Sequence, residues 1–115
     1  MRVAGFGFRQ GASLASFQAA LALTGGADAL TTVEAKLPGL SDLARTTGLP
    51  LIAVPKATLA LHPRPGSPRV KALYGTGSVA ESAALAAAGP GASLTQPRLT
   101  SPDGQVVIAI AEAKP

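Results

Sequence analysis

Two glycines directly before a long alanine-rich run place the strongest constraint on how this chain folds. Gly75 and Gly77 precede the run 79–88, which has the composition of a helix. Ser78 and Glu81 have the spacing of a capping box, in which the hydroxyl accepts from the N–H of the third helical residue and the carboxylate reaches back to the N–H of the cap. We therefore expect a tight loop and a helix start that present backbone N–H groups, a hydroxyl and a carboxylate together.

This loop is a candidate anion-binding site, because unpaired N–H groups at the start of a helix carry partial positive charge. The predicted ligand-binding residues are Gly75, Thr76, Gly77 and Ser78. A second interpretation is that Ser78 and Glu81 only cap the helix.

Short apolar runs that alternate with helical patterns predict an α/β fold. Strands are expected at 3–9, 30–34, 49–54, 92–101 and 105–111, an extended piece at 69–74, and helices at 11–23, 38–45, 56–61 and 79–88. The turn signal at 102–104 predicts an antiparallel hairpin at one edge of the sheet. We expect a single three-layer domain over 1–115, with a mainly parallel sheet of about five or six strands.

The segment 62–68 contains three prolines, which remove backbone donors and restrict their neighbours. It is predicted to be an irregular, flexible surface loop. His62 is interpreted as a solvated loop residue rather than a catalytic one.

Three basic residues follow expected strands: Arg9, Lys36 and Arg98. In open α/β sheets, ligands gather at the carboxyl ends of the strands, so these cations and Gly7 are candidate ligand-binding residues. The spacing Gly5-x-Gly7-x-x-x-Gly11 differs by one residue from the dinucleotide fingerprint, and no NAD or FAD site is predicted.

Composition narrows the class of function further. The chain has no cysteine and a single histidine, so no disulfide, thiolate chemistry, metal site or resident cofactor is expected. The net charge is +4, but the basic residues are dispersed and aromatic residues make up 3%, which disfavours nucleic-acid binding and suits a small polyanionic ligand. No apolar run is long enough for a membrane span and no signal peptide is visible, so a cytoplasmic protein is expected.

Three segments in this order resemble the CobE family, which is equivalent to the C-terminal domain of the cobalamin biosynthesis protein CbiG. They are Gly5-Phe6-Gly7-Phe8-Arg9-x-Gly11-Ala12-Ser13, the segment 30–36, and Gly75-Thr76-Gly77-Ser78-Val79-Ala80-Glu81-Ser82-Ala83-Ala84-Leu85. The block Val-Ala-Glu-x-Ala-Ala-Leu is the most specific part, and the resemblance covers essentially the whole chain.

The resemblance implies a role in building the corrin ring of cobalamin (vitamin B12), with a precorrin intermediate as ligand and other pathway enzymes as partners. As a free-standing domain the chain resembles the form associated with the aerobic route. Full-length CbiG is associated with opening a precorrin lactone and releasing a two-carbon fragment. The family commonly has an acidic residue between Lys36 and Gly39, and its absence here weakens a two-carboxylate mechanism.

Two hypotheses of function stay open, so whether the chain is an enzyme is undecided. The first is a corrinoid-binding or carrier protein without turnover. The second is a lactone-opening hydrolase, with Glu81 as general acid or base and Lys36 or Arg9 stabilising an oxyanion. A methyltransferase is disfavoured by the length of the chain. The alanine-rich helix is expected to be exposed and could pack against a second copy of the chain or a partner enzyme.

Overall fold

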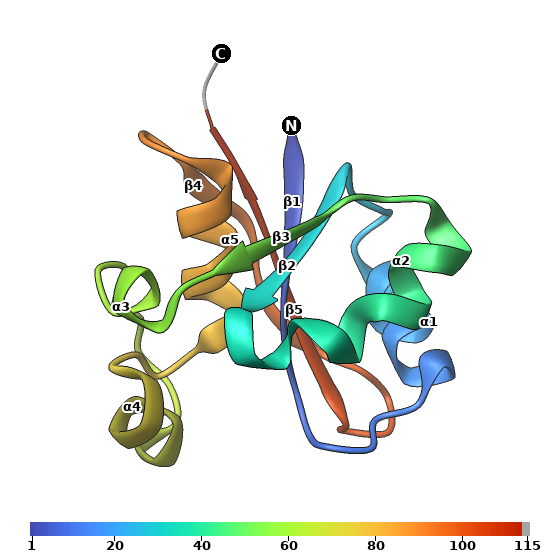
Figure 1. The fold of residues 1–115 in the computed structure, drawn as a ribbon, viewed down its shortest axis with the longest axis horizontal. Helices are drawn as coiled ribbons and strands as arrows, with labels where there is room; N and C mark the ends of the chain where they lie inside the picture. Colours follow the sequence, from blue (N-terminus) through green and yellow to red (C-terminus); the bar gives the residue numbers. More distant parts are fainter. Residues whose placement is uncertain (114–115) are drawn as a thin grey trace.

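A mixed β-sheet forms the centre of the structure, a computed structural model that describes residues 1–113 (Figure 1). Its strands are β1 (Arg2–Phe8), β2 (Ala29–Val33), β3 (Leu51–Val54), β4 (Ser93–Thr100) and β5 (Val106–Glu112). The helices are α1 (Leu14–Leu23), the 3-10 helix η1 (Glu34–Leu40), α2 (Ser41–Thr47), α3 (Lys56–Leu59), α4 (Pro68–Tyr74) and α5 (Val79–Ala88).

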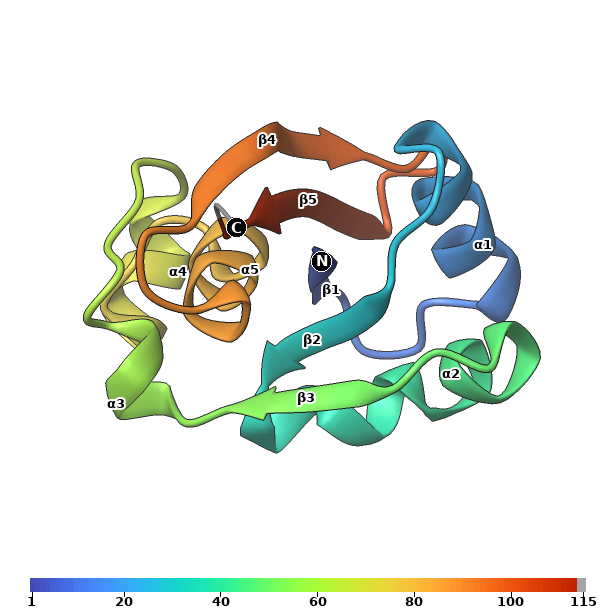
Figure 2. The ribbon, with the colours of Figure 1, turned by 90° about the horizontal axis from the view of Figure 1, so that it is seen from above.

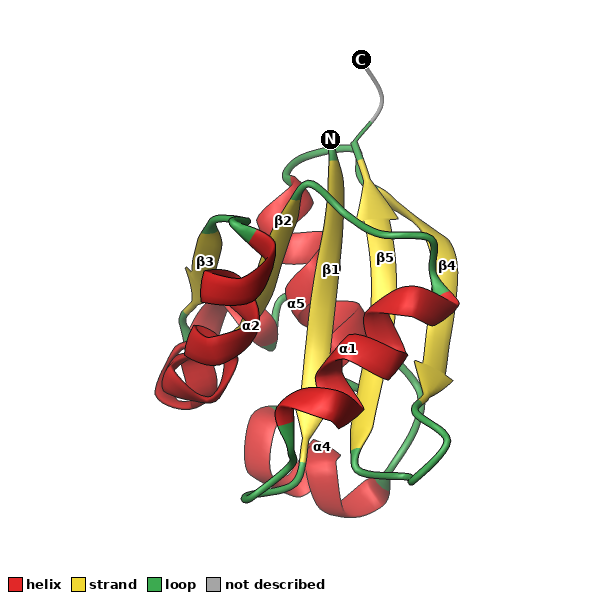
Figure 3. Cartoon of the chain, turned by 90° about the vertical axis from the view of Figure 1, so that its right-hand side faces the viewer, coloured by secondary structure: helices red, strands yellow, loops and turns green. Residues whose placement is uncertain are grey.

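The strand order is β3-β2-β1-β5-β4, as Figure 3 shows. β1 pairs with β2 and β2 with β3 in parallel, whereas β5 runs antiparallel to both β1 and β4. The α/β class and the hairpin at the edge are confirmed. The sheet is mixed: β1, β2 and β3 pair in parallel, as expected for most of it. The tight turn before β5 reverses the chain, so β5 pairs antiparallel with β1 along its whole length as well as with β4.

Burial explains why β5 lies inside the sheet and β4 at its edge. Five of the seven residues of β5 are buried, which requires cover on both faces of the strand. None of the residues of β4 is fully buried, and β4 contains Pro97 beside a shift in register. Proline lacks the N–H that an inner strand needs, so β4 is suited only to the edge.

One face of the sheet packs against α1, η1 and α2 around three phenylalanines. The ring of Phe17 from α1 meets the rings of Phe6 and Phe8 edge-on, with centroids 5.8 and 5.0 Å away. Aliphatic side chains from the other elements complete this core, which includes Leu30, Leu40, Leu43, Val106, Ile108 and Ile110.

Helix α5 lies against the opposite face of the sheet (Figure 2), and Gly5 allows its close approach. A Cβ atom on Gly5 would lie only 2.8 Å from the backbone nitrogen of Ala84 and still closer to the carbonyl oxygen of Ala80. The first six residues of α5 are buried. The expectation that the alanine-rich helix is exposed is therefore wrong. Its small side chains allow it to pack against the chain's own sheet.

Two segments differ in secondary structure from the prediction. The expected extended piece 69–74 is helix α4, because Ser67 caps its start through a bond from the N–H of Val70 and Gly75 ends it in the left-handed region. The helix expected at 38–45 begins as η1 and becomes α-helical at Ser41, while Gly48 ends it as predicted. Within residues 1–113, no helix is both long and apolar enough to cross a membrane.

We predict that Gly5→Ala destabilises the fold by about 3 kcal/mol, because the new methyl group must push α5 away from β1. Gly7→Ala is the matched control, since a Cβ atom there meets its nearest neighbour at an ordinary 3.8 Å. Its unfolding free energy should stay within about 1 kcal/mol of wild type. Urea unfolding measures both, and equal stability of the two variants would contradict the account of this contact.

Candidate functional site

A cavity of about 600 Å³ opens where β1 ends, and we call it the strand-end cavity. Segments that are far apart in the sequence meet around it: the end of β1, η1, α4, the start of α5, and both sides of the hairpin. Its lining residues are Gly7, Phe8, Arg9, Lys36, Gly66, Ser67, Val70, Tyr74, Gly77, Ser78, Val79, Ala80, Arg98, Thr100, Gly104, Gln105 and Val107.

Most of the residues predicted from the sequence line this one cavity. They are Gly7, Arg9, Lys36, Gly77, Ser78 and Arg98. Three predicted residues do not line it. Thr76 and Glu81 are buried behind its wall, and Gly75 lies at a second, shallower hollow against α3 and α4.

Three of the four backbone N–H groups of the 75–78 loop already have acceptors in the protein, so most of the loop backbone is not open to the anion expected there. The N–H of Gly75 donates to Lys71 at the end of α4, and that of Gly77 donates to the carbonyl of Arg64. The N–H of Ser78 donates to Oγ1 of Thr76. Lys71 and Thr76 are near neighbours in the chain, whereas the bond to Arg64 could not be read from the sequence, because the 62–67 segment meets the loop only in three dimensions.

Behind the cavity wall, Thr76 holds this loop together from a fully buried position. Its Oγ1 accepts from the N–H of Arg64 at 3.0 Å and from that of Ser78 at 3.3 Å. It also shares a hydrogen bond of 2.7 Å with the hydroxyl of Ser82, which in turn donates to the carbonyl of His62. Thr76 is thus a structural centre of the site rather than part of its surface.

Only half of the predicted capping box forms. The Oγ of Ser78 accepts from the N–H of Glu81 at 3.2 Å, as expected of an N-cap. The carboxylate of Glu81 does not reach back to Ser78, whose N–H is already bound by Thr76. The carboxylate is therefore available for other partners.

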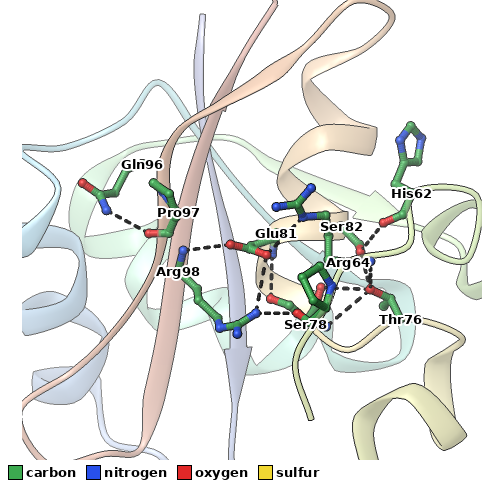
Figure 4. Close-up of polar contacts among 10 residues, drawn as sticks. His62, Arg64, Thr76, Ser78, Glu81, Ser82, Gln96, Pro97 and Arg98 are labelled. Atoms are coloured by element: carbon green, nitrogen blue, oxygen red, sulfur yellow. Dashed lines mark hydrogen bonds and ion pairs between the residues drawn. The ribbon is translucent and has the colours of Figure 1, made fainter. Parts of the chain in front are cut away.

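Glu81 instead pairs with two arginines, as Figure 4 shows. Only 3% exposed, it accepts at 3.2 Å from Nε of Arg64, and Nη1 of Arg98 lies 3.6 Å from the same oxygen. The second oxygen accepts from the backbone N–H of Arg98 at 3.1 Å. A buried carboxylate requires such partners, since its desolvation is costly.

Arg64 could not be selected from the sequence, because it lies in the proline-rich segment that is predicted to be a flexible surface loop. Residues 62–67 are irregular, as predicted, but they are bound to the 75–78 loop. The N–H of Ser67 donates to Gly77, and a Cβ atom on Gly77 would lie 2.7–2.8 Å from the backbone of Pro65 and Arg64. This segment is therefore a fixed wall of the cavity.

Lys36 reaches back from η1 to the end of β1. Its Nζ donates to the carbonyl oxygen of Phe8 at 2.5 Å and lies 4.8 Å from the centre of the Phe8 ring. Burial lowers the pKa of this ammonium group, because it loses part of its hydration. Arg9 is exposed at the rim of the same cavity.

Four apolar side chains give the cavity a hydrophobic surface between these cations: Phe8, Val70, Val79 and Val107. Tyr74 and Gln105 add polar groups that could not be selected from the sequence, because Tyr74 ends the expected extended piece and Gln105 begins an expected strand. Among residues 1–113 no group of three or more His, Cys, Asp or Glu side chains could hold a metal ion.

Comparison with known proteins matches residues 2–111 to the family described as the cobalamin synthesis G C-terminus. A crystal structure of CobE, described as a protein from the cobalamin (vitamin B12) biosynthetic pathway, is 30% identical with a TM-score of 0.79, over 99% of this chain and 91% of that one. The cobalamin biosynthesis protein chiG from Agrobacterium tumefaciens is 32% identical with a TM-score of 0.79, over the full length of both chains. No curated protein matches the chain.

We predict that Thr76→Val lowers the unfolding free energy by about 2–4 kcal/mol, because the N–H groups of Arg64 and Ser78 lose their acceptor inside the protein. Thr46→Val is the matched control at an exposed position and should change stability by less than about 1 kcal/mol. Urea denaturation, fitted with the same m-value for both variants, measures the two unfolding free energies. Similar stability of the two variants would show that Thr76 does not organise the loop.

Proposed function

The chain belongs to the family of the cobalamin synthesis G C-terminus and is a cobalamin biosynthesis protein; from this membership we propose that the strand-end cavity binds a corrinoid (precorrin) intermediate. Such intermediates carry many carboxylates around a large apolar macrocycle. A binding site for them needs separated cations and an apolar surface.

The observation that carries the proposal is the convergence of three cations on one cavity. Arg9 comes from the end of β1, Lys36 from η1 and Arg98 from β4, and apolar side chains line the surface between them. Arginine can bind a carboxylate through two parallel hydrogen bonds, and such charge-assisted bonds are roughly twice as strong as neutral ones. The cavity also includes Val79 and Ala80, where the first N–H groups of α5 lack partners within the helix.

Binding without turnover is the form of the proposal that the geometry favours. The alternative, a hydrolase that opens a precorrin lactone, would use Glu81 as general acid or base. Glu81 does not line the cavity, and both carboxylate oxygens already accept hydrogen bonds from arginines. A general base must reach the proton that it removes. The buried, fully bonded carboxylate of Glu81 therefore supports a carrier or binding role in the pathway.

We predict that the purified protein retains hydrogenobyrinic acid through a desalting column, with an unchanged visible spectrum. Arg9→Ala and Lys36→Ala should each weaken binding about tenfold, the loss expected when one charge-assisted contact is removed. Arg45→Ala removes the same charge from a position outside the cavity, where Arg45 pairs with Asp42, and serves as the control.

Absorbance titrations at matched ionic strength give the dissociation constants. A spectral change with release of a new product would instead favour the hydrolase. If wild type retains no corrinoid even in low salt, or if Arg45→Ala weakens binding as much as the cavity variants, the proposed site is wrong.

Affinity should also depend on pH through Lys36. Burial lowers the pKa of Lys36 below the ordinary value of a lysine, so its positive charge is lost at a lower pH than that of a solvated lysine. Affinity should be constant well below the lowered pKa and should fall as pH rises through it, because a neutral amine no longer attracts a carboxylate. Titration of hydrogenobyrinic acid from pH ~7 to ~10 tests this range. Lys36→Met should lack the decrease, and identical profiles would contradict a contact between Lys36 and the ligand.

A further inference from the structure

We propose that Glu81 is a positioning residue that fixes the guanidinium of Arg98 at the strand-end cavity, so that it receives a ligand carboxylate. The inference rests on the proposed function, because it concerns the same cavity. It assigns Glu81 a role in binding affinity through Arg98, rather than a direct contact with the ligand.

Arg98 is held at both its backbone and its side chain. Its N–H donates to one carboxylate oxygen of Glu81 at 3.1 Å, and its Nη1 lies 3.6 Å from the other. Nη1 also donates to the carbonyl oxygen of Pro65 at 2.5 Å. These contacts come from α5 and from the 62–67 loop, so the guanidinium is oriented by two different segments.

The rest of the guanidinium is left for a ligand. The side chain of Arg98 is 43% exposed, and within residues 1–113 only its Nη1 donates a side-chain hydrogen bond to the protein. Without these contacts, a long arginine side chain on an edge strand would sample many rotamers, and the ligand would have to order it on binding. Pre-orienting the side chain lowers that entropy cost.

Arg64 holds the carboxylate of Glu81 in place. Its Nε donates to the carboxylate oxygen that also lies near Nη1 of Arg98, and its backbone carbonyl accepts from the N–H of Gly77. The carboxylate is thus fixed between two guanidinium groups. Glu81, the one buried acid among residues 1–113, therefore links the 62–67 loop, α5 and β4 behind the cavity.

Electrostatics and positioning predict opposite outcomes when the charge of Glu81 is removed. Glu81→Gln removes a negative charge beside the cavity, so simple attraction predicts tighter binding of a polycarboxylate. Loss of positioning predicts weaker binding, because the amide cannot hold the guanidinium as an ionised carboxylate does. The direction of the change in affinity therefore separates the two effects.

The experiment is a double-mutant cycle with hydrogenobyrinic acid as the probe. We expect Glu81→Gln to weaken binding about tenfold in the wild-type background and in the Arg9→Ala background. In the Arg98→Ala background it should change affinity less than about twofold, because the residue through which it acts is absent. Arg9 is the matched control, since it lines the same cavity and, within residues 1–113, makes no ion pair with Glu81.

The possible results separate the positioning role of Glu81 from the proposed function of the cavity. Tighter or unchanged binding by Glu81→Gln overturns the positioning role, and so does a tenfold loss that persists in the Arg98→Ala background. If Glu81→Gln does not fold, Glu81→Asp keeps the charge but withdraws the oxygens from the N–H of Arg98, and it should bind about tenfold more weakly; wild-type affinity would overturn the inference. Failure of wild type to bind the probe would instead overturn the proposed function itself.

Discussion

The contact between Gly5 and α5 is the constraint on which the rest of the structure depends. Because residue 5 has no side chain, the backbone of α5 lies directly on β1, and Ala80 and Ala84 fit where larger residues would not. This contact sets the depth and direction of α5. It thereby places the start of the helix, with Ser78 and Glu81, beside the carboxyl end of β1.

Local patterns predicted the parts of the fold that local forces determine. The start of α5 at Val79 and the hairpin turn were readable, because a cap and a turn involve only neighbouring residues. The pairing of β5 with β1 was not, since it depends on burial of β5 on both faces. Helix α4 was misjudged because Ser67 and Gly75, its two ends, were assigned to the loops on either side.

In the candidate site, too, features set by position along the chain could be predicted, whereas contacts between distant residues could not. Cations that follow strands, Arg9, Lys36 and Arg98, could be selected because the ends of neighbouring strands meet in this class of fold. The partners of Glu81 could not, because Arg64 and Arg98 are 17 residues away on either side. The N–H groups of Gly75 and Ser78 bind local acceptors, and that of Gly77 binds the distant Arg64, so the 75–78 loop mainly supports the side chains that line the cavity.

The position of β5 has a consequence for how the chain folds as it is synthesised. Of the strands of this sheet β1 is made before the others, yet its antiparallel partner β5 is made after them, and the side chains of Arg2 and Glu112 that meet across the pair are 110 residues apart. Until β5 is available, β1 lacks a neighbour on one side and α5 lacks part of the surface that it covers. Pairing over such a separation is slow. The half-formed sheet therefore offers an open, apolar strand edge that molecular chaperones could bind until β5 has left the ribosome.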